Sequence, residues 1–153
     1  MIKEKLSEIN FVRVFLLSLT LICFGGLVMW DYHRLSEDFL NVMSLLRDVR
    51  LYAAETDKNM AVRFDGENII VKDLGSDEQY KTLKVQTLHK VNYDTTLGKG
   101  IIVFTGIGTS PYNLKVHGGD LVLKAWFGFK KYIWVNCTGF AKEGRYPDEE
   151  PVD

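Results

Sequence analysis

The chain of 153 residues has only two cysteines, Cys23 and Cys137. Cys23 lies inside an apolar stretch and Cys137 lies far along the chain, so we expect one in a membrane and the other in water, and predict no disulfide between them. The three histidines, His33, His89 and His117, have no metal-site spacing and no cysteine pair to assist them. We therefore predict no metal and no cofactor, and the cysteine count leaves the compartment undecided.

Charged residues are absent from Val14 to Trp30. A helix over this run is about 25 Å long, near the short end for a segment that crosses a membrane. Phe11 and Val12 extend the span to residues 11–30 if the Arg13 side chain reaches back to the headgroups. Trp30 and Tyr32 stand where interfacial aromatic residues belong. We predict a transmembrane segment over residues 11–30.

The flanks of this run indicate an anchor that is retained. A cleavable signal peptide has a shorter apolar core and ends in small residues, whereas this run ends in VMWDYHR. Lys3, Lys5 and Arg13 precede the run and only Arg34 follows it closely, so the positive-inside rule places the N-terminus in the cytoplasm. Residues 1–10 are then a basic leader or cytoplasmic segment, and the rest of the chain lies outside.

Proline and glycine are both absent between Leu27 and Asp65, so nothing in this stretch breaks a helix. Apolar residues recur there at steps of four and three, which is typical of an amphipathic helix. A partner coiled coil or the following sheet could cover this stripe. We predict one long helix over residues 11–58, amphipathic over 31–58, with these helix-packing residues: Leu35, Phe39, Val42, Leu46, Val49 and Ala53.

From Met60 onward the apolar period becomes two, and turn-rich segments separate short runs. The pattern predicts an antiparallel β domain over residues 59–145, in one sheet or two, with one face on the helix. An acidic tail, residues 146–153, follows. The fold class is α+β. The expected strands cover residues 60–64, 69–73, 80–91, 100–104, 112–116, 120–127 and 132–137.

Three stretches carry a resemblance to a known family. They are SLLRDVRLYAAETDKNMAVRF, GIIVFTGIGTS and GDLVLKAWFGFKKYIWVNCTGFAKEGR, within about residues 40–145. The chain also has one long N-terminal helix, expected to lie half in the membrane and half on an antiparallel sheet. Together these features resemble the minor pseudopilin H family of type II secretion and the related type IV minor pilins. Arg50, Ala53, Ala54 and Val62 match the end of that family's helix and its first strand, and Gly139 matches the close of its last hairpin. The resemblance implies a type IV pilin-like fold and a bacterial inner-membrane location.

The front of the chain departs from that family. Its precursors carry a glycine before a phenylalanine, where a peptidase cuts, and a glutamate at the fifth mature position. Here Asn10 precedes Phe11, and Phe15 stands in place of the glutamate. A glutamate side chain in lipid is costly and needs a partner. Phe15 avoids that cost, and it cannot form the corresponding contact with a neighbouring subunit. Three outcomes stay open for a pilin-like subunit: no processing at Asn10 and Phe11, weak joining of a filament, or capping of one. A related anchored protein that never polymerises is the other alternative.

No motif indicates an enzyme. Gly106-Ile107-Gly108 lacks the third glycine and the following helix of a dinucleotide site, and we interpret it as a loop. Ser44, Ser76 and Ser110 have no neighbouring base that the sequence reveals. We predict no catalytic residue, and a membrane-anchored hydrolase is the remotest of the hypotheses.

Lysines outnumber acids nine to two between Tyr80 and Lys142. Strand alternation places a mixture of lysines and aromatic rings on an outward face, a combination that suits protein contacts or a polyanion. Two plainer interpretations compete: a second sheet covers the rings, and the lysines form a solvated face that guards edge strands. The candidate partner surface is Lys124, Trp126, Lys130, Lys131, Tyr132 and Trp134.

These patterns together favour a minor pilin-like subunit of a type II secretion or type IV pilus machine, with a non-catalytic assembly or tip role. Its expected partners are other pilin-like subunits, inner-membrane assembly proteins and membrane lipid. The alternative is a monomeric, membrane-tethered extracytoplasmic domain that binds DNA or another polyanion.

Overall fold

The computed structural model describes residues 2–92, 94–95, 98–106, 119–136 and 138–144, with the backbone alone for residues 2–11, 94, 95 and 98. The helix α1 runs without a break over Ile2–Thr56, and at about 1.5 Å per residue it is about 82 Å long. It therefore includes the expected leader 2–10, whose leucine, glutamate and lysine residues favour helix. It also ends two residues earlier than the predicted 58.

The end of α1 is a Schellman-type cap. Asp57 adopts a left-handed backbone with φ of 52°, and the N–H of Lys58 donates to the carbonyl of Ala53 at 3.2 Å. This arrangement reverses the chain and leads it directly into the first strand.

In the described part of the chain ten strands follow α1, and eight of them form two antiparallel four-stranded sheets. The first sheet has the order β3-β2-β1-β7 and the second has the order β10-β9-β8-β4. A short ladder pairs β5 with β6. The strand bounds are β1 Met60–Asp65, β2 Asn68–Asp73, β3 Gln79–Lys84, β4 Leu88–Asn92, β5 Asp94–Thr95, β6 Gly98–Lys99, β7 Ile101–Phe104, β8 Gly119–Lys124, β9 Lys130–Val135 and β10 Ala141–Glu143.

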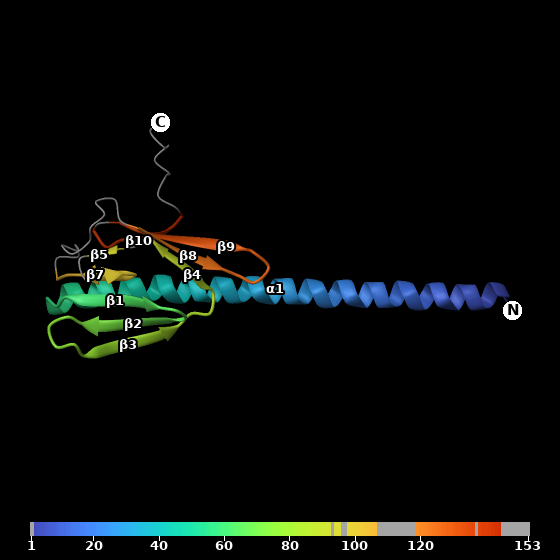
Figure 1. Ribbon diagram of the computed structural model, residues 1–153, viewed down its shortest axis with the longest axis horizontal. Helices are drawn as coiled ribbons and strands as arrows, with labels where there is room; N and C mark the ends of the chain where they lie inside the picture. The colour runs from blue at the N-terminus through green and yellow to red at the C-terminus, as the bar shows by residue number, and fades with distance from the viewer. Residues whose placement is uncertain (1, 93, 96–97, 107–118, 137, 145–153) are drawn as a thin grey trace, which may run out of the picture.

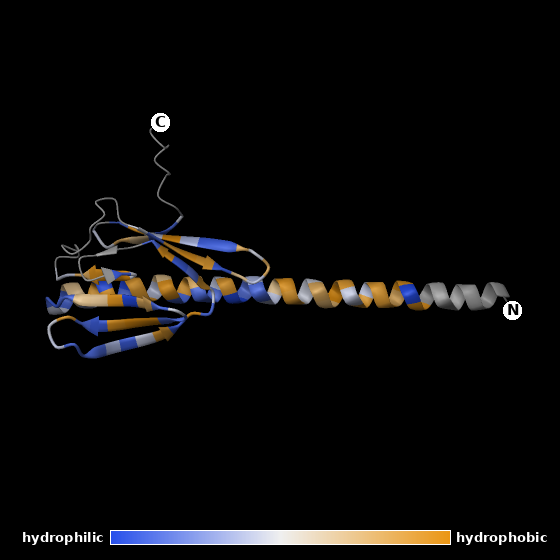
Figure 2. Ribbon diagram, in the orientation of Figure 1, coloured by the Kyte–Doolittle hydropathy of each residue, from blue (hydrophilic) through white to orange (hydrophobic). Residues whose placement is uncertain are grey.

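The two sheets gather around the C-terminal half of α1, and the N-terminal half projects beyond them (Figure 1). Helix residues and residues of both sheets share one hydrophobic core. Figure 2 shows that the projecting part of α1 is largely apolar although no sheet covers it. The expected α+β class, with a long apolar N-terminal helix and antiparallel sheets, is confirmed.

One expected strand, residues 80–91, is in fact two strands in different sheets. β3 ends at Lys84 and β4 begins at Leu88. Between them Val85 and Thr87 are buried, and the N–H of Val85 donates to the carbonyl of Glu67 at 2.6 Å. The alternating pattern continues through this crossover, which is why the sequence predicted a single strand. β10 and the β5–β6 ladder were not predicted, and the expected strand 112–116 and tail 146–153 lie outside the described residues.

Candidate functional site

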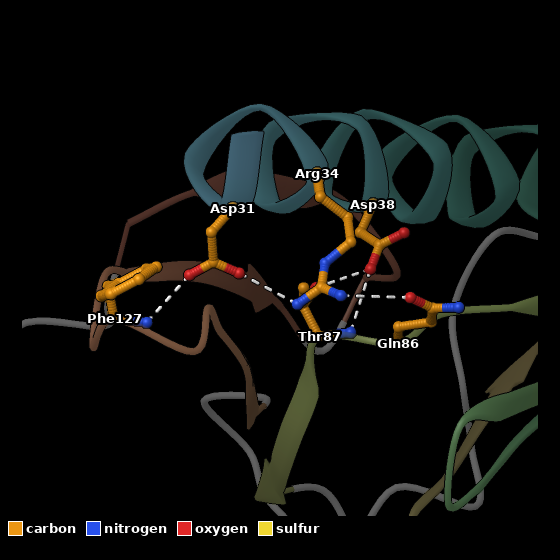
Figure 3. A network of polar contacts seen from close by, with 6 residues as sticks. All are labelled: Asp31, Arg34, Asp38, Gln86, Thr87 and Phe127. Carbon is orange, nitrogen blue, oxygen red and sulfur yellow. Dashed lines mark hydrogen bonds and ion pairs between the residues drawn. The ribbon is translucent and has the colours of Figure 1, made fainter. Parts of the chain in front are cut away.

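A polar junction joins α1 to the sheet domain where the bare half of the helix ends (Figure 3). Asp31 is only 1% exposed. One of its carboxylate oxygens accepts a hydrogen bond from the backbone N–H of Phe127 at 2.8 Å, and the other accepts one from the Arg34 guanidinium at 2.9 Å. The negative charge of Asp31 is therefore paired and hydrogen-bonded at the level where the helix enters the domain.

The second half of the junction lies two turns further along the same face of α1. Asp38 accepts hydrogen bonds from both the backbone N–H and the hydroxyl of Thr87, at 3.0 and 2.8 Å. Arg34 reaches the side chain of Gln86 at 3.3 Å. The carbonyl of Thr87 accepts from the N–H of Lys124 at 2.7 Å. The crossover between the sheets is thus held both to the helix and to β8.

The sequence interpretation missed this junction. The predicted packing residues do not include Asp38, whereas Asp38 is buried. The residue precedes Phe39 and follows Leu35 by three, so it lies at the edge of the same helix face. Asp31 and Arg34, three residues apart, were a further signal for an ion pair on that face.

The six predicted helix-packing residues all lie in the core. Leu35, Phe39, Val42, Leu46, Val49 and Ala53 are between 0 and 6% exposed. They contact residues from both sheets, together with Leu45, which the four-and-three spacing did not include.

The N-terminal half of α1 has no such cover. From Val12 to Trp30 the large apolar side chains are exposed, apart from a partly covered Val28. α1 contains a window long and apolar enough to cross a membrane, and none of that window is buried within the protein. This finding is compatible with single-pass membrane anchoring. The side chains of Asn10 and Phe11 lie outside the described residues, although their backbone is helical.

The predicted partner surface is divided between three places. Tyr132 and Trp134 lie on the outer face of the second sheet, where Tyr132 is opposite Val122 and Trp134 is opposite Asp120. Both rings are partly covered, and the ammonium of Lys142 lies 4.4 Å from the centre of the Trp134 ring. Val122 lies on the same face and is only 5% exposed, so this face is itself partly packed.

Two members of the predicted surface, Lys131 and Trp126, lie elsewhere. Lys131 faces the helix side, with its ammonium 4.6 Å from the centre of the Phe39 ring. Trp126 is 85% exposed but belongs to the turn between β8 and β9, not to the sheet face. Lys124 and Lys130 pair across the base of that hairpin and lie on the same outer face as Tyr132 and Trp134. Four of the six predicted residues therefore share one face, whereas Trp126 belongs to the turn, where strand alternation does not continue, and Lys131 occupies an inward position.

An ion pair fixes the start of the sheet domain. The Lys58 ammonium lies 3.0 Å from the Asp73 carboxylate. The N–H of Gly75 donates to Asp73 at 2.8 Å and, with Lys58, lowers the pKa of that carboxyl below its ordinary value. The hydrogen bond from Lys58 to Asp73 raises the pKa of the lysine.

The described residues contain no cluster of three or more histidine, cysteine, aspartate or glutamate side chains that could hold a metal ion. Cys23 is a free, exposed thiol on the bare half of α1. His33 lies 3.8 Å from Glu37 on the exposed side of the helix, and His117 lies outside the described residues.

Comparison of the chain with protein-family models, with curated proteins and with solved structures found no match.

Proposed function

We propose that this protein is a minor pilin-like subunit of a bacterial secretion or pilus machine, with a type IV pilin-like fold and a non-catalytic assembly role. The observation that carries the proposal is the division of one unbroken helix into two halves. The bare apolar half of α1 needs lipid or other helices around it, and the other half is the central element of a folded domain.

The geometry of α1 suits a subunit that exchanges lipid for protein neighbours. Its bare half shows apolar side chains on nearly all sides, as expected for a helix that is surrounded first by lipid and then by other helices. An exposed strip continues from it along the covered half and includes Leu40, Arg47 and Leu51. Neighbouring subunits could therefore contact α1 along much of its length.

The proposed topology follows the charge distribution. Lys3, Lys5 and Arg13 lie on the N-terminal side of the span, so we place that end in the cytoplasm and the sheets in the periplasm or outside the cell.

Site-specific photocrosslinking in intact cells tests the proposal. A benzophenone amino acid replaces Phe15, Ile22 or Met29, all exposed on the bare half, in a strain that expresses its own pilin-like proteins. We expect adducts with proteins that themselves have a long apolar N-terminal helix, identified by mass spectrometry. The same amino acid at the buried Phe39 is the matched control and should give no adduct.

If the three positions give adducts with lipid alone, or only with proteins that lack such a helix, the assembly role is wrong. The mass of the mature N-terminus adds an independent result. A chain that begins at Phe11 has been processed as a pilin despite Asn10, whereas an intact start favours a plain anchor.

The alternative is a tethered domain for DNA or another polyanion. Lys124, Lys130, Tyr132 and Trp134 share the outer face of the second sheet and support it, whereas Lys131 lies on the helix side and Trp126 in the turn. This alternative predicts binding that weakens steeply with salt. Binding that is absent, or indifferent to salt, would remove it.

A further inference from the structure

The turn between β8 and β9 extends further along α1 toward the N-terminus than any other labelled part of the sheets (Figure 1). Its residues are Ala125–Phe129, with the sequence AWFGF. The N–H of Ala125 donates to the carbonyl of Phe129 at 2.8 Å, and Gly128 has a positive φ of 91° that permits the tight reversal. The turn is therefore a compact tip at the end of a regular hairpin.

Two ring contacts and one hydrogen bond attach this tip to α1. The Phe127 ring meets the Phe24 ring edge-on, with 5.4 Å between centroids, and Phe129 meets Tyr32 in the same way at 5.5 Å. The N–H of Phe127 donates to Asp31. Phe24 precedes Asp31 by seven residues, or about 10 Å along the helix axis. The tip thus extends beside residues of the apolar run.

The tip also exposes three large aromatic side chains. Trp126 is 85% exposed, and Phe127 and Phe129 are 40 and 41% exposed. Three large rings within four residues form a patch that is continuous with the bare side chains of α1. Exposed patches of this kind mark a surface that another phase or protein covers.

A basic collar surrounds the base of the tip. Lys124 and Lys130 are cross-strand partners, and Lys131 lies beside Tyr32 and Phe39. On the same helix face as Asp31, Arg34 stacks over Trp30 at 5.0 Å. Aromatic rings at the end of an element with lysines just behind them match the layers of a bilayer, in which apolar chains lie beneath anionic and zwitterionic headgroups.

We propose that the hairpin tip Trp126–Phe129 inserts into the leaflet from which α1 emerges, as a second membrane contact beside the transmembrane segment. Lys124 and Lys130 then contact lipid phosphates. This inference rests on the anchoring part of the proposed function. Its consequence is that the sheets sit directly on the membrane in a fixed rotation about α1, until the subunit leaves the bilayer and the tip meets a protein neighbour instead.

Depth-dependent quenching of tryptophan tests the insertion. The chain has three tryptophans, so three full-length variants each retain one: Trp30→Phe with Trp134→Phe leaves Trp126, and the corresponding pairs leave Trp30 or Trp134. Each is reconstituted in vesicles of phosphatidylethanolamine and phosphatidylglycerol that contain lipids brominated at defined acyl positions. We expect the brominated lipids to quench Trp126 at least as strongly as Trp30, and its emission to lie further to the blue than that of Trp134.

The three variants separate the possible failures. Strong quenching of Trp30 with none of Trp126 leaves the anchor intact and overturns the inserted tip. Absence of quenching in both overturns the anchor and the tip together. Trp134 is the matched control, because it lies in the same hairpin but away from its tip, and should be quenched least.

A second measurement does not depend on removing tryptophans. A nitroxide is placed at Trp126→Cys in a chain with Cys23→Ser and Cys137→Ser. Its collisions with oxygen should exceed those with a water-soluble nickel chelate, and the same label at Thr82→Cys on β3 should show the reverse. Equal behaviour of the two labels contradicts the insertion, and protection of Trp126 from both reagents indicates that a second copy of the chain covers the tip instead.

Discussion

The Asp38 carboxylate and Thr87 are separated by 49 positions in the chain, and a single oxygen of Asp38 accepts both the backbone N–H and the hydroxyl of Thr87. Both residues are buried, so neither can exchange this partner for water without opening the domain. The contact fixes the point at which the chain leaves the first sheet and enters the second.

Replacement Asp38→Ala should destabilise the domain by about 2–4 kcal/mol, because it leaves the buried N–H and hydroxyl of Thr87 without their acceptor. Urea unfolding of the full chain in detergent, followed by near-ultraviolet circular dichroism, measures the loss. Glu37→Ala, at the neighbouring exposed position, should change the stability by less than about 0.5 kcal/mol. Equal effects of the two substitutions would show that the junction contributes nothing specific.

Two leucines on opposite faces of α1 offer a matched pair. Leu46 is fully buried and Leu40 is 64% exposed. Leu46→Ala should lower the unfolding free energy by about 2–5 kcal/mol, since it removes buried methyl groups and leaves a cavity. Leu40→Ala should leave folding nearly unchanged and, under the proposed function, reduce contacts with neighbouring subunits in the crosslinking assay. A stability loss of similar size in both variants would contradict the packing of α1 described here.

Gly106 is required by a close approach to the end of α1. A Cβ built there would overlap the carboxylate of Asp57 and come within 2.9 Å of its Cα. Gly106→Ala should therefore cost about 1–3 kcal/mol through strain where β7 leads past the helix cap. The control is Gly26→Ala, where a Cβ meets nothing within 4 Å inside the protein and where alanine favours the helix. Thermal unfolding of both variants in detergent measures the contrast.

The contribution of the Asp73 carboxyl to the stability of the domain should depend on pH in the acidic range. Hydrogen bonds from Gly75 and Lys58 lower its folded-state pKa, so its contribution is present above the ordinary value of 3.8 and is lost as the pH falls through the lowered value. Asp73→Asn should be less stable than the parent at neutral pH, and the two should converge in strong acid.

The pH dependence of stability in the alkaline range follows from Lys58. Its folded-state pKa is raised, so the contribution of the ion pair is present below 10.5 and is lost as the pH rises through the raised value. The difference in denaturant midpoint between the parent and Asp73→Asn should become smaller across this range, while the part due to the Gly75 hydrogen bond remains. Asp77→Asn, which removes the exposed partner of Lys72, should give a nearly constant difference from the parent. A constant difference for Asp73→Asn as well would contradict the role of this pair.

The sequence was sufficient for the helix and its buried face. An uninterrupted run from Leu35 to Ala53 with steps of four and three leaves one solution, a helix with that stripe in the core. β1, β2, β8 and β9 were also predictable, because alternation and turn residues are local signals.

The remaining features depend on contacts between distant segments. The crossover at Thr87 has no turn residue of its own, since Asp38 on the helix holds it in place. Lys131 looks like a solvent-facing lysine, yet its ammonium lies 4.6 Å from the centre of the Phe39 ring on the helix side of the sheet. The contact between Asp31 and Phe127 could not be read from the chain either, since Phe127 offers only a backbone N–H, which every residue but proline carries.

The order of the strands has a consequence for how the domain forms. The first sheet takes β1, β2 and β3 from one segment and β7 from a later one, and the second sheet begins with β4 and is completed only after β7. Neither sheet is therefore a contiguous piece of chain, and neither can be completed before the other has begun. Their assembly is a single cooperative event with many long-range pairings, which is intrinsically slow. Nearly the whole chain must therefore be synthesised before both sheets can cover the helix stripe.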